Sequence, residues 1–293
     1  MYNNCPECGS YNKPGTAFCD CGYAFDYKGF HSKDAKDHTE MLLFITLKRV
    51  CIGAMVLSVV VFACTFPFRN LLPGIASIRP ELYLDPIQTE ENIPPQFEVS
   101  QGNQTYQVLP RFQYELYGLV VSHHHSDSVT DVLHEKWDDF LNIKDLCVVW
   151  GSNIETGVYK EITYSSGNFT CFCKFADHEI ASRFDGTALS NNHLLSDDPK
   201  LSRRILDTRN GDQIHLKGYL SKYMNHRNGF SRDTSTNRTD RGNGACETIY
   251  VTDFEIIEPA NAIVRILNTL SWMIFSACVV LFFSLAFIFP KQK

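Results

Sequence analysis

The sequence lacks an excess of positive charge, since 27 Lys and Arg residues stand against 33 Asp and Glu residues. Recognition of nucleic-acid phosphates needs a basic surface, so we expect no nucleic-acid partner. The sequence also lacks Gly-x-Ser-x-Gly, the turn that carries the nucleophile of α/β-hydrolases. Its two longest apolar runs contain no Asp, Glu, Lys or Arg, the residues that mark ion pathways inside membranes. The absence of charged residues from the two runs argues against a pump or a channel.

The two apolar runs are long enough to cross a bilayer as helices. Val50–Phe68 has 19 residues and Ile266–Phe289 has 24. As helices they reach about 28 Å and about 36 Å, against about 30 Å for a hydrocarbon core. Buried core helices are the alternative, but the absence of charge and the abrupt Lys and Arg flanks favour membrane spans. The first run lies too deep in the chain for a cleaved signal peptide.

Basic residues beside the two runs predict the orientation. Only Arg69 and Arg79 follow the first run closely. Five basic residues precede it: Lys28, Lys33, Lys36, Lys48 and Arg49. The positive-inside rule therefore places both termini in the cytoplasm and residues 69–265 outside it. We expect a two-span protein in contact with membrane lipid, with a bacterial inner membrane as its location. Met41–Leu47, cut off by Lys48 and Arg49, could extend the helix with those two charges snorkelling or lie along the interface, and we favour the interfacial segment.

Four cysteines in the N-terminal head have the spacing of metal ligands. Cys5-x-x-Cys8 is followed by Gly9, and Cys19-x-Cys21 is followed by Gly22. Four thiolates around a tetrahedral zinc need two tight turns, which glycine permits. A redox Cys-x-x-Cys would need a surrounding βαβ fold, which so short a segment lacks. A disulfide is disfavoured in a reducing cytoplasm.

The head resembles the short zinc ribbons found at the N-termini of many bacterial membrane proteins. The match covers residues 4–25 and rests on Cys5, Pro6, Cys8, Gly9, Asn12, Gly15, Phe18, Cys19, Cys21 and Gly22. It departs from the family at the second knuckle, which lacks one spacer residue. The resemblance implies a structural zinc, closed by four protein ligands, and a face on which a protein partner docks.

The chain divides into seven expected segments along this plan. They are the ribbon (1–25), a tether and interfacial segment (26–49), the first span (50–68), a proline-rich strap (69–96), an extracytoplasmic domain (97–259), the second span (266–289) and a cytoplasmic tail (290–293). The fold class is an α+β membrane protein whose outer domain is mostly β.

Patterning predicts the elements of the outer domain. Strands are expected over 106–122, 145–150, 157–164, 168–175, 211–223 and 247–257, and helices over 130–142 and 199–207. Gly211–Tyr223 and the last of these strands resemble, loosely, parts of small closed barrels of the OB type.

Cys147, Cys171, Cys173 and Cys246 lie in this domain, where an oxidising compartment would permit disulfides. Cys171 and Cys173 are two apart in a strand and share a face. A bond from Cys147 to one of them would tie neighbouring strands, and Cys246 could take the other. Three pairings are open, and buried free thiols are the alternative.

Three groups of residues have candidate chemistry in the outer domain. His123-His124-His125 could bind a metal, but consecutive residues point in different directions, so a solvated loop tip is the favoured interpretation. Ser190 with His193, near Asp197 and Asp198, or Ser190 or Ser196 with Lys217, could form a hydrolase pair. The segment Asn225–Ala245 carries four arginines that could capture a phosphate or carboxylate, unless it is a mobile solvated loop: Arg227, Arg232, Arg238 and Arg241.

These features predict a membrane-anchored sensor or adaptor, whose outer domain binds a ligand and whose cytoplasmic ribbon docks a protein. A membrane-anchored hydrolase is the alternative, so the question of enzymatic activity stays open. The sequence identifies neither the ligand nor the oligomeric state, and homo-oligomerisation remains open as well.

Overall fold

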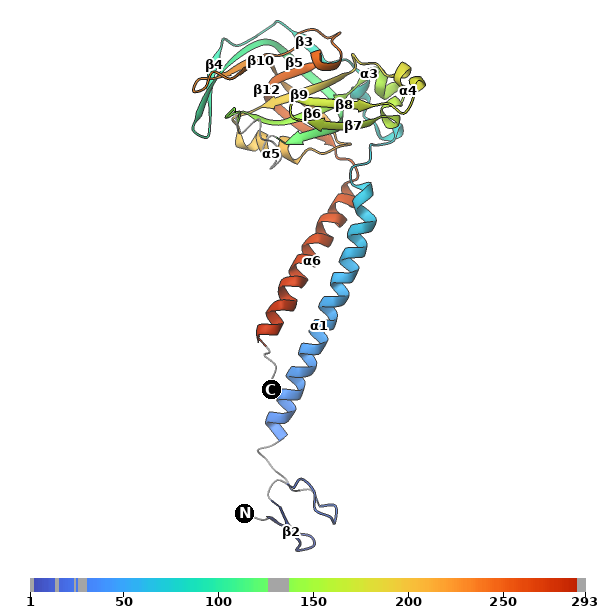
Figure 1. Cartoon of the computed structure of the whole chain (residues 1–293), viewed down its shortest axis with the longest axis vertical. Coiled ribbons are helices and arrows are strands. Elements are labelled where there is room, and N and C mark those ends of the chain that lie inside the picture. The colour runs from blue at the N-terminus through green and yellow to red at the C-terminus, as the bar shows by residue number, and fades with distance from the viewer. Residues whose placement is uncertain (1–2, 14–15, 24, 26–30, 126–136, 289–293) are drawn as a thin grey trace. The chain divides into compact units, whose positions relative to one another are not determined.

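The structure, a computed structural model, describes residues 3–13, 16–23, 25, 31–125 and 137–288. The chain forms two compact units, one made of Met1–Cys64 with Leu267–Lys293 and the other of Thr65–Ile266 (Figure 1). We call the second the outer unit. Each unit is described by itself.

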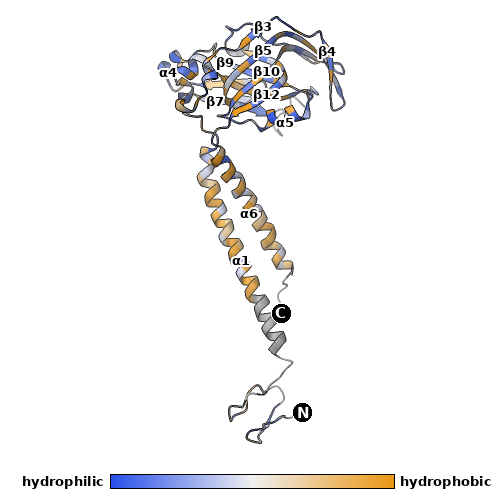
Figure 2. Cartoon of the chain, turned by 180° about the vertical axis from the view of Figure 1, so that it is seen from behind, coloured by the Kyte–Doolittle hydropathy of each residue, from blue (hydrophilic) through white to orange (hydrophobic). Residues whose placement is uncertain are grey.

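The first unit contains two long helices, α1 (His31–Thr65) and α6 (Ala262–Ile288, which starts inside the outer unit). Both are long and apolar enough to cross a membrane, over Leu42–Phe68 and Ala262–Leu285 (Figure 2). Only 11% of each of these windows is buried, whereas the core helix of a soluble protein would be mostly covered. The two helices touch where Asn268 Nδ2 donates a hydrogen bond to the Phe62 carbonyl over 3.3 Å.

Helix α1 corrects one expectation. It runs without a break through Met41–Leu47 and through Lys48 and Arg49, so the predicted separate interfacial segment is wrong. The ammonium group of Lys48 lies 4.3 Å from the centre of the Phe44 ring. Its aliphatic stem can therefore follow the helix surface while the charge rests on an aromatic face.

The head before α1 contains a two-stranded ladder, β1 (Asn3–Asn4) with β2 (Tyr11–Asn12). The outer unit is built on an eight-stranded sheet in the described residues. Its strands are β3 (Ile87–Thr89), β4 (Phe97–Gln101), β5 (Gln104–His125), β6 (Asn142–Val149), β9 (Leu189–Leu195), β10 (Gln213–Asn225), β11 (Ser231–Arg232) and β12 (Cys246–Glu258). A separate hairpin, β7 (Thr163–Gly167) with β8 (Thr170–Lys174), stands beside it. The short helices are α3 (Gly151–Glu155), α4 (His178–Arg183) and α5 (Pro199–Asp207).

Five of these strands pair in a circuit. Antiparallel ladders join β5 to β6, β6 to β9, β12 to β10, and β10 back to β5. The remaining link, β9 to β12, is parallel. Helix α5 connects β9 to β10, with Asp198 accepting hydrogen bonds from the first turn and Pro199 at its start. Buried aliphatic side chains from these strands form the main core, among them Leu116, Val120, Leu146, Val148 and Ile214.

Most predicted elements of the outer domain are confirmed, and two differ from the structure. Residues 157–164 form a 3₁₀ turn (Val158–Glu161) before β7, because Gly157 takes a left-handed φ of 71° instead of an extended one. Of the predicted helix 130–142, residues 130–136 lie outside the described part of the chain. Trp137–Leu141 are turn and irregular structure, and Asn142 begins β6, so the helix prediction is wrong there.

The segment 69–96 packs onto the outer unit. Leu82 is fully buried, and β3 pairs with β5 in the sheet. Tyr159 donates a hydrogen bond from its hydroxyl to the Pro73 carbonyl over 2.7 Å. Prolines exclude a long helix here, as expected, and of the two 3₁₀ turns at Ile75–Ser77 and Pro80–Tyr83 the second buries an apolar side chain, Leu82.

The two ends of the outer unit meet at Arg265. Its guanidinium donates to the buried carboxylate of Asp212 over 2.6 Å and to the Arg69 carbonyl over 2.9 Å. Asn261 adds a hydrogen bond to the Leu71 carbonyl at 2.8 Å. We call these contacts the terminal clasp.

Candidate functional site

The four cysteines of the head converge. Their sulfurs all lie within 4.8 Å of one another, with 3.5 Å between Cys5 and Cys21 and between Cys8 and Cys19. Cys5 and Cys19 are buried, whereas Cys8 and Cys21 are exposed. Four thiols at these distances could together hold a metal ion. Among the residues that the structure describes, no other group of three or more His, Cys, Asp or Glu side chains is placed to do so.

The glycines explain why the turns close. Gly9 and Gly22 have φ values of 74° and 92°, in the left-handed region that glycine enters freely. Each follows its cysteine pair and hydrogen-bonds back, to the carbonyl of Cys5 and of Cys19 respectively. The Asn12 amide donates to Cys19 Sγ over 3.4 Å, and hydrogen bonding from Ser10 lowers the pKa of the Cys8 thiol to about 6. Both contacts favour the thiolate form that metals require.

The outer unit contains a cavity of about 550 Å³. One wall is the β7–β8 hairpin and the chain that follows it, another is β9, and a third is the chain between β11 and β12. The described lining residues are Phe169, Thr170, Cys171, Cys173, Phe175, Phe184, Gly186, Leu189, Asn191, Arg232, Gly242, Ala245 and Cys246.

A disulfide fastens the hairpin wall to the sheet. Cys147 on β6 is bonded to Cys171 on β8, which resolves the pairing that the sequence left open. Cys173 and Cys246 are free thiols, and both line the cavity. Burial raises the pKa of each, to about 11 for Cys173, so both are protonated near neutral pH.

A buried chain of polar groups ends at the cavity. His193 and Asp145 are fully buried, and His193 Nδ1 lies 2.7 Å from Asp145 Oδ1. Arg232 Nη2 lies 2.9 Å from His193 Nε2. Because a guanidinium can only donate, Nε2 must accept, so the imidazole is neutral and donates from Nδ1 to Asp145. The guanidinium also stacks 4.2 Å from the centre of the Phe169 ring.

Asn191 is the second polar residue turned to the cavity from the sheet. It is 2% exposed, and no described residue gives either polar atom of its amide a well-formed hydrogen bond, although the weakly bonding thiol of Cys246 lies beside it. An unsatisfied buried amide costs about 1–3 kcal/mol, so such groups commonly await a ligand or water.

The predicted hydrolase pairs do not form. Ser190 and His193 lie three apart on β9 and therefore point to opposite faces. Ser190 Oγ hydrogen-bonds to the Asn192 amide, while His193 is held by Asp145 and Arg232. Asp197 accepts from the Tyr250 hydroxyl, Asp198 caps α5, and Lys217 pairs with Glu115 at 3.3 Å.

The histidine triplet continues β5 and is not a loop tip. His123 Nδ1 lies 2.6 Å from Asn210 Oδ1, and burial lowers the pKa of His123 to about 3. The rings of His123 and His125 meet edge to face at 5.2 Å. The triplet belongs to no metal-binding group among the described residues.

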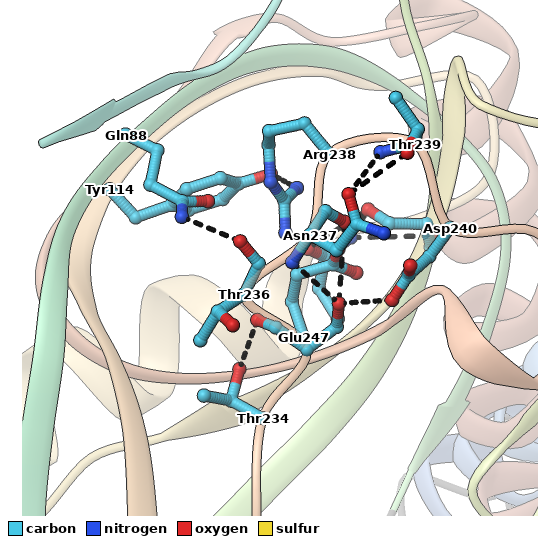
Figure 3. Close-up of polar contacts among 12 residues, drawn as sticks. Gln88, Tyr114, Thr234, Thr236, Asn237, Arg238, Thr239, Asp240 and Glu247 are labelled. Atoms are coloured by element: carbon cyan, nitrogen blue, oxygen red, sulfur yellow. Dashed lines mark hydrogen bonds and ion pairs between the residues drawn. The ribbon is translucent and has the colours of Figure 1, made fainter.

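The arginine-rich segment Asn225–Ala245 is fastened to the sheet (Figure 3). Arg238 pairs with the buried carboxylate of Glu247 at 2.9 Å and lies over the Tyr114 ring. The Gln88 amide donates to the Thr236 carbonyl, and Ser235 hydrogen-bonds to Asp240. Of the four arginines, Arg232 alone lines the cavity.

Sequence reasoning singled out Arg232 and His193 but missed their connection to Asp145, and it missed Asn191. One signal was present, because Lys144 and Asp145 interrupt the apolar strand IKDLCVV with two charges that must find partners. β9 gave no such signal, since Ser-Asn-Asn-His resembles a turn.

Comparison with known proteins adds no assignment. No protein-family model matches the chain, and no curated protein or solved structure matches it significantly.

Proposed function

We propose that this protein is a membrane-anchored binding protein. Its outer unit takes a small ligand into the cavity beside Arg232, and its cysteine head is a zinc ribbon that docks a protein partner. α1 and α6 are the two membrane spans, with both termini in the cytoplasm. The observation that carries the proposal is the cavity, whose wall holds a positioned guanidinium and a buried amide without a well-formed hydrogen bond among the described residues.

Zinc suits the donor set of the head. Tetrahedral Zn–S bonds of about 2.3 Å separate the sulfurs by about 3.8 Å, near the 3.5 Å between Cys5 and Cys21 and between Cys8 and Cys19. Four protein thiolates leave no open coordination position, so the metal would be structural: Cys5, Cys8, Cys19 and Cys21 would hold it. The contribution of the metal is to fold a segment too short for a core of its own.

The strand circuit supports a barrel of the OB type in the outer unit. Five strands return to the first, one link is parallel, and a helix connects the third strand of the circuit to the fourth in chain order. Small barrels of this type bind ligands on the face of their second and third strands and the loops beside it. Here that face is formed by β6 and β9, and β9 contributes Leu189 and Asn191 to the cavity.

No observation favours the hydrolase alternative, because the pairs that suggested it are separated. Binding can be tested on the full chain in detergent by native mass spectrometry after incubation with a small-molecule extract of the host cells. We expect a bound small molecule on the wild type. Ala245→Phe fills the cavity and should lose it, whereas Ala181→Phe, on the half-buried α4 outside the lining, should retain it. Equal binding by all three proteins would refute the cavity as the site.

A further inference from the structure

We propose that the cavity binds a small monocarboxylate with an apolar, preferably aromatic, body. This inference rests on the proposed binding function and names the chemical class of its ligand. It is argued from Arg232, Asn191, the aromatic walls and the charges that line the cavity.

Arg232 is held in place while most of its donors are unused. Among the described residues its guanidinium hydrogen-bonds only to His193, which Asp145 fixes in turn. Stacking on Phe169 fixes the plane of the group. A guanidinium has five N–H donors in a planar fork, and one is spent here, so the remaining edge can hold a carboxylate with two parallel hydrogen bonds.

The charge balance favours a single negative charge. The described lining residues include one cation, Arg232, and neither Asp nor Glu. Asp145, the nearest carboxylate in the chain of contacts, is buried beneath the wall and occupied by His193, the Asn142 amide and the Phe169 N–H. A phosphate dianion would leave one charge without a cation in the described lining, and burying an unpaired charge is costly. A monocarboxylate would not.

Asn191 supplies a second polar contact. Its amide is buried without a well-formed hydrogen bond among the described residues, and it offers both a donor and an acceptor. On the parallel ladder it stands beside Cys246, whose thiol also lines the cavity. A carboxylate held by Arg232 could accept from the Asn191 NH₂ group and satisfy that donor.

The rest of the lining is suited to an apolar body. Phe169, Phe175 and Phe184 contribute three aromatic rings, and Leu189 and Ala245 add aliphatic surface. Phe175 and Phe184 pack against each other with ring centres 5.3 Å apart. A volume of about 550 Å³ lies within the range of pockets that enclose drug-sized ligands.

The test uses four probes with related bodies and different head groups: 2-naphthylacetate, decanoate, 2-(2-naphthyl)ethanol and 2-(2-naphthyl)ethylamine. The full chain in detergent is pulsed with a maleimide, and alkylation of Cys173 and Cys246 is read by peptide mass spectrometry. The internal control is a cysteine introduced at Leu84 (Leu84→Cys), an exposed position of the outer unit outside the cavity lining. The dissociation constant of each probe is measured in parallel by isothermal titration calorimetry.

We expect the naphthyl carboxylate to slow alkylation of Cys173 and Cys246 at least tenfold while the cysteine introduced at Leu84 reacts unchanged. Arg232→Gln should weaken carboxylate binding at least tenfold and leave the alcohol unaffected. Arg111→Gln is the matched control, because Arg111 is exposed and pairs only with Asp233 on the surface. Asn191→Leu, which keeps Arg232, is a second variant in case Arg232→Gln does not fold, and it should weaken the carboxylate severalfold.

The possible outcomes distinguish the ligand class proposed here from the proposed function, which is the binding of any small ligand in the cavity. Decanoate binding more tightly than naphthylacetate would keep the carboxylate and overturn the aromatic preference. Alcohol or amine protecting the two thiols as well as the carboxylate would overturn the ligand class while the cavity remains a binding site. Protection by no probe, or carboxylate binding unchanged in Arg232→Gln, would also overturn the class. The cavity-filling experiment decides independently whether the cavity binds anything.

Discussion

Breaking the bond between Cys147 and Cys171 should destabilise the outer unit by a calculable amount. The two cysteines are 24 residues apart, so the bond closes a loop of about 25 residues in the unfolded chain. The loop-closure relation gives about 3.5 kcal/mol of lost stability at 25 °C. For a unit of this size 1 kcal/mol shifts the melting temperature by about 2–4 °C, so we expect a fall of about 10 °C.

The assay is thermal unfolding of the full chain in detergent, with and without the reductant TCEP. A Cys147→Ala, Cys171→Ala double variant should melt about 10 °C low and no longer respond to TCEP. Cys173→Ala is the matched control, since it removes a free thiol two residues from the bond and should keep the full response. A change below about 2 °C in the double variant would refute the reasoning, as would a TCEP response that Cys173→Ala abolishes.

Three further predictions concern other parts of the molecule. Burial raises the pKa of Glu247 to about 7, so between about pH 4.5 and 7 the folded chain keeps a proton that the unfolded chain has lost. The free energy of unfolding should therefore fall by up to about 3 kcal/mol as pH rises over that range. Urea titrations of Glu247→Gln should show a correspondingly flatter pH profile, and an unchanged profile would contradict the prediction. Cys5→Ser should reduce bound zinc from about one per chain to near zero by elemental analysis and leave the melting of the outer unit unchanged, whereas full zinc retention would argue against the four-cysteine site. Leu82→Ala should lower the free energy of unfolding in urea by about 3 kcal/mol, because Leu82 is fully buried. Leu84→Ala, at a position 64% exposed, should lower it by less than about 0.5 kcal/mol. Equal losses would mean that the segment 69–96 is not part of the folded unit.

Local chemistry made much of this architecture predictable. The two long helices follow from runs without charge, and the cysteine cluster follows from spacing and two glycines, because both depend on residues close in sequence. Strands β10 and β12 also follow from their alternation of apolar and polar residues.

The candidate site in the outer unit could not be predicted, because contacts between distant segments create it. β9 resembles a turn in sequence, and only its place between β6 and β12 makes Ser190-Asn191-Asn192-His193 extended and buried. Arg232 and Asp145 both hydrogen-bond to His193, and these contacts depend on the pairing of strands far apart in the chain. The packing of the segment 69–96 could not be predicted for the same reason, since the burial of Leu82 depends on a core that the segment itself does not contain.

The terminal clasp has a consequence for how this protein can be handled. Since Arg265 grips the Arg69 carbonyl and Asn261 grips the Leu71 carbonyl, the first and last residues of the outer unit are neighbours in space. A domain whose ends are neighbours can be excised from the chain or circularly permuted without moving its termini apart. Residues 65–266, excised and joined head to tail by a short glycine linker, should therefore fold as a detergent-free, backbone-cyclised protein.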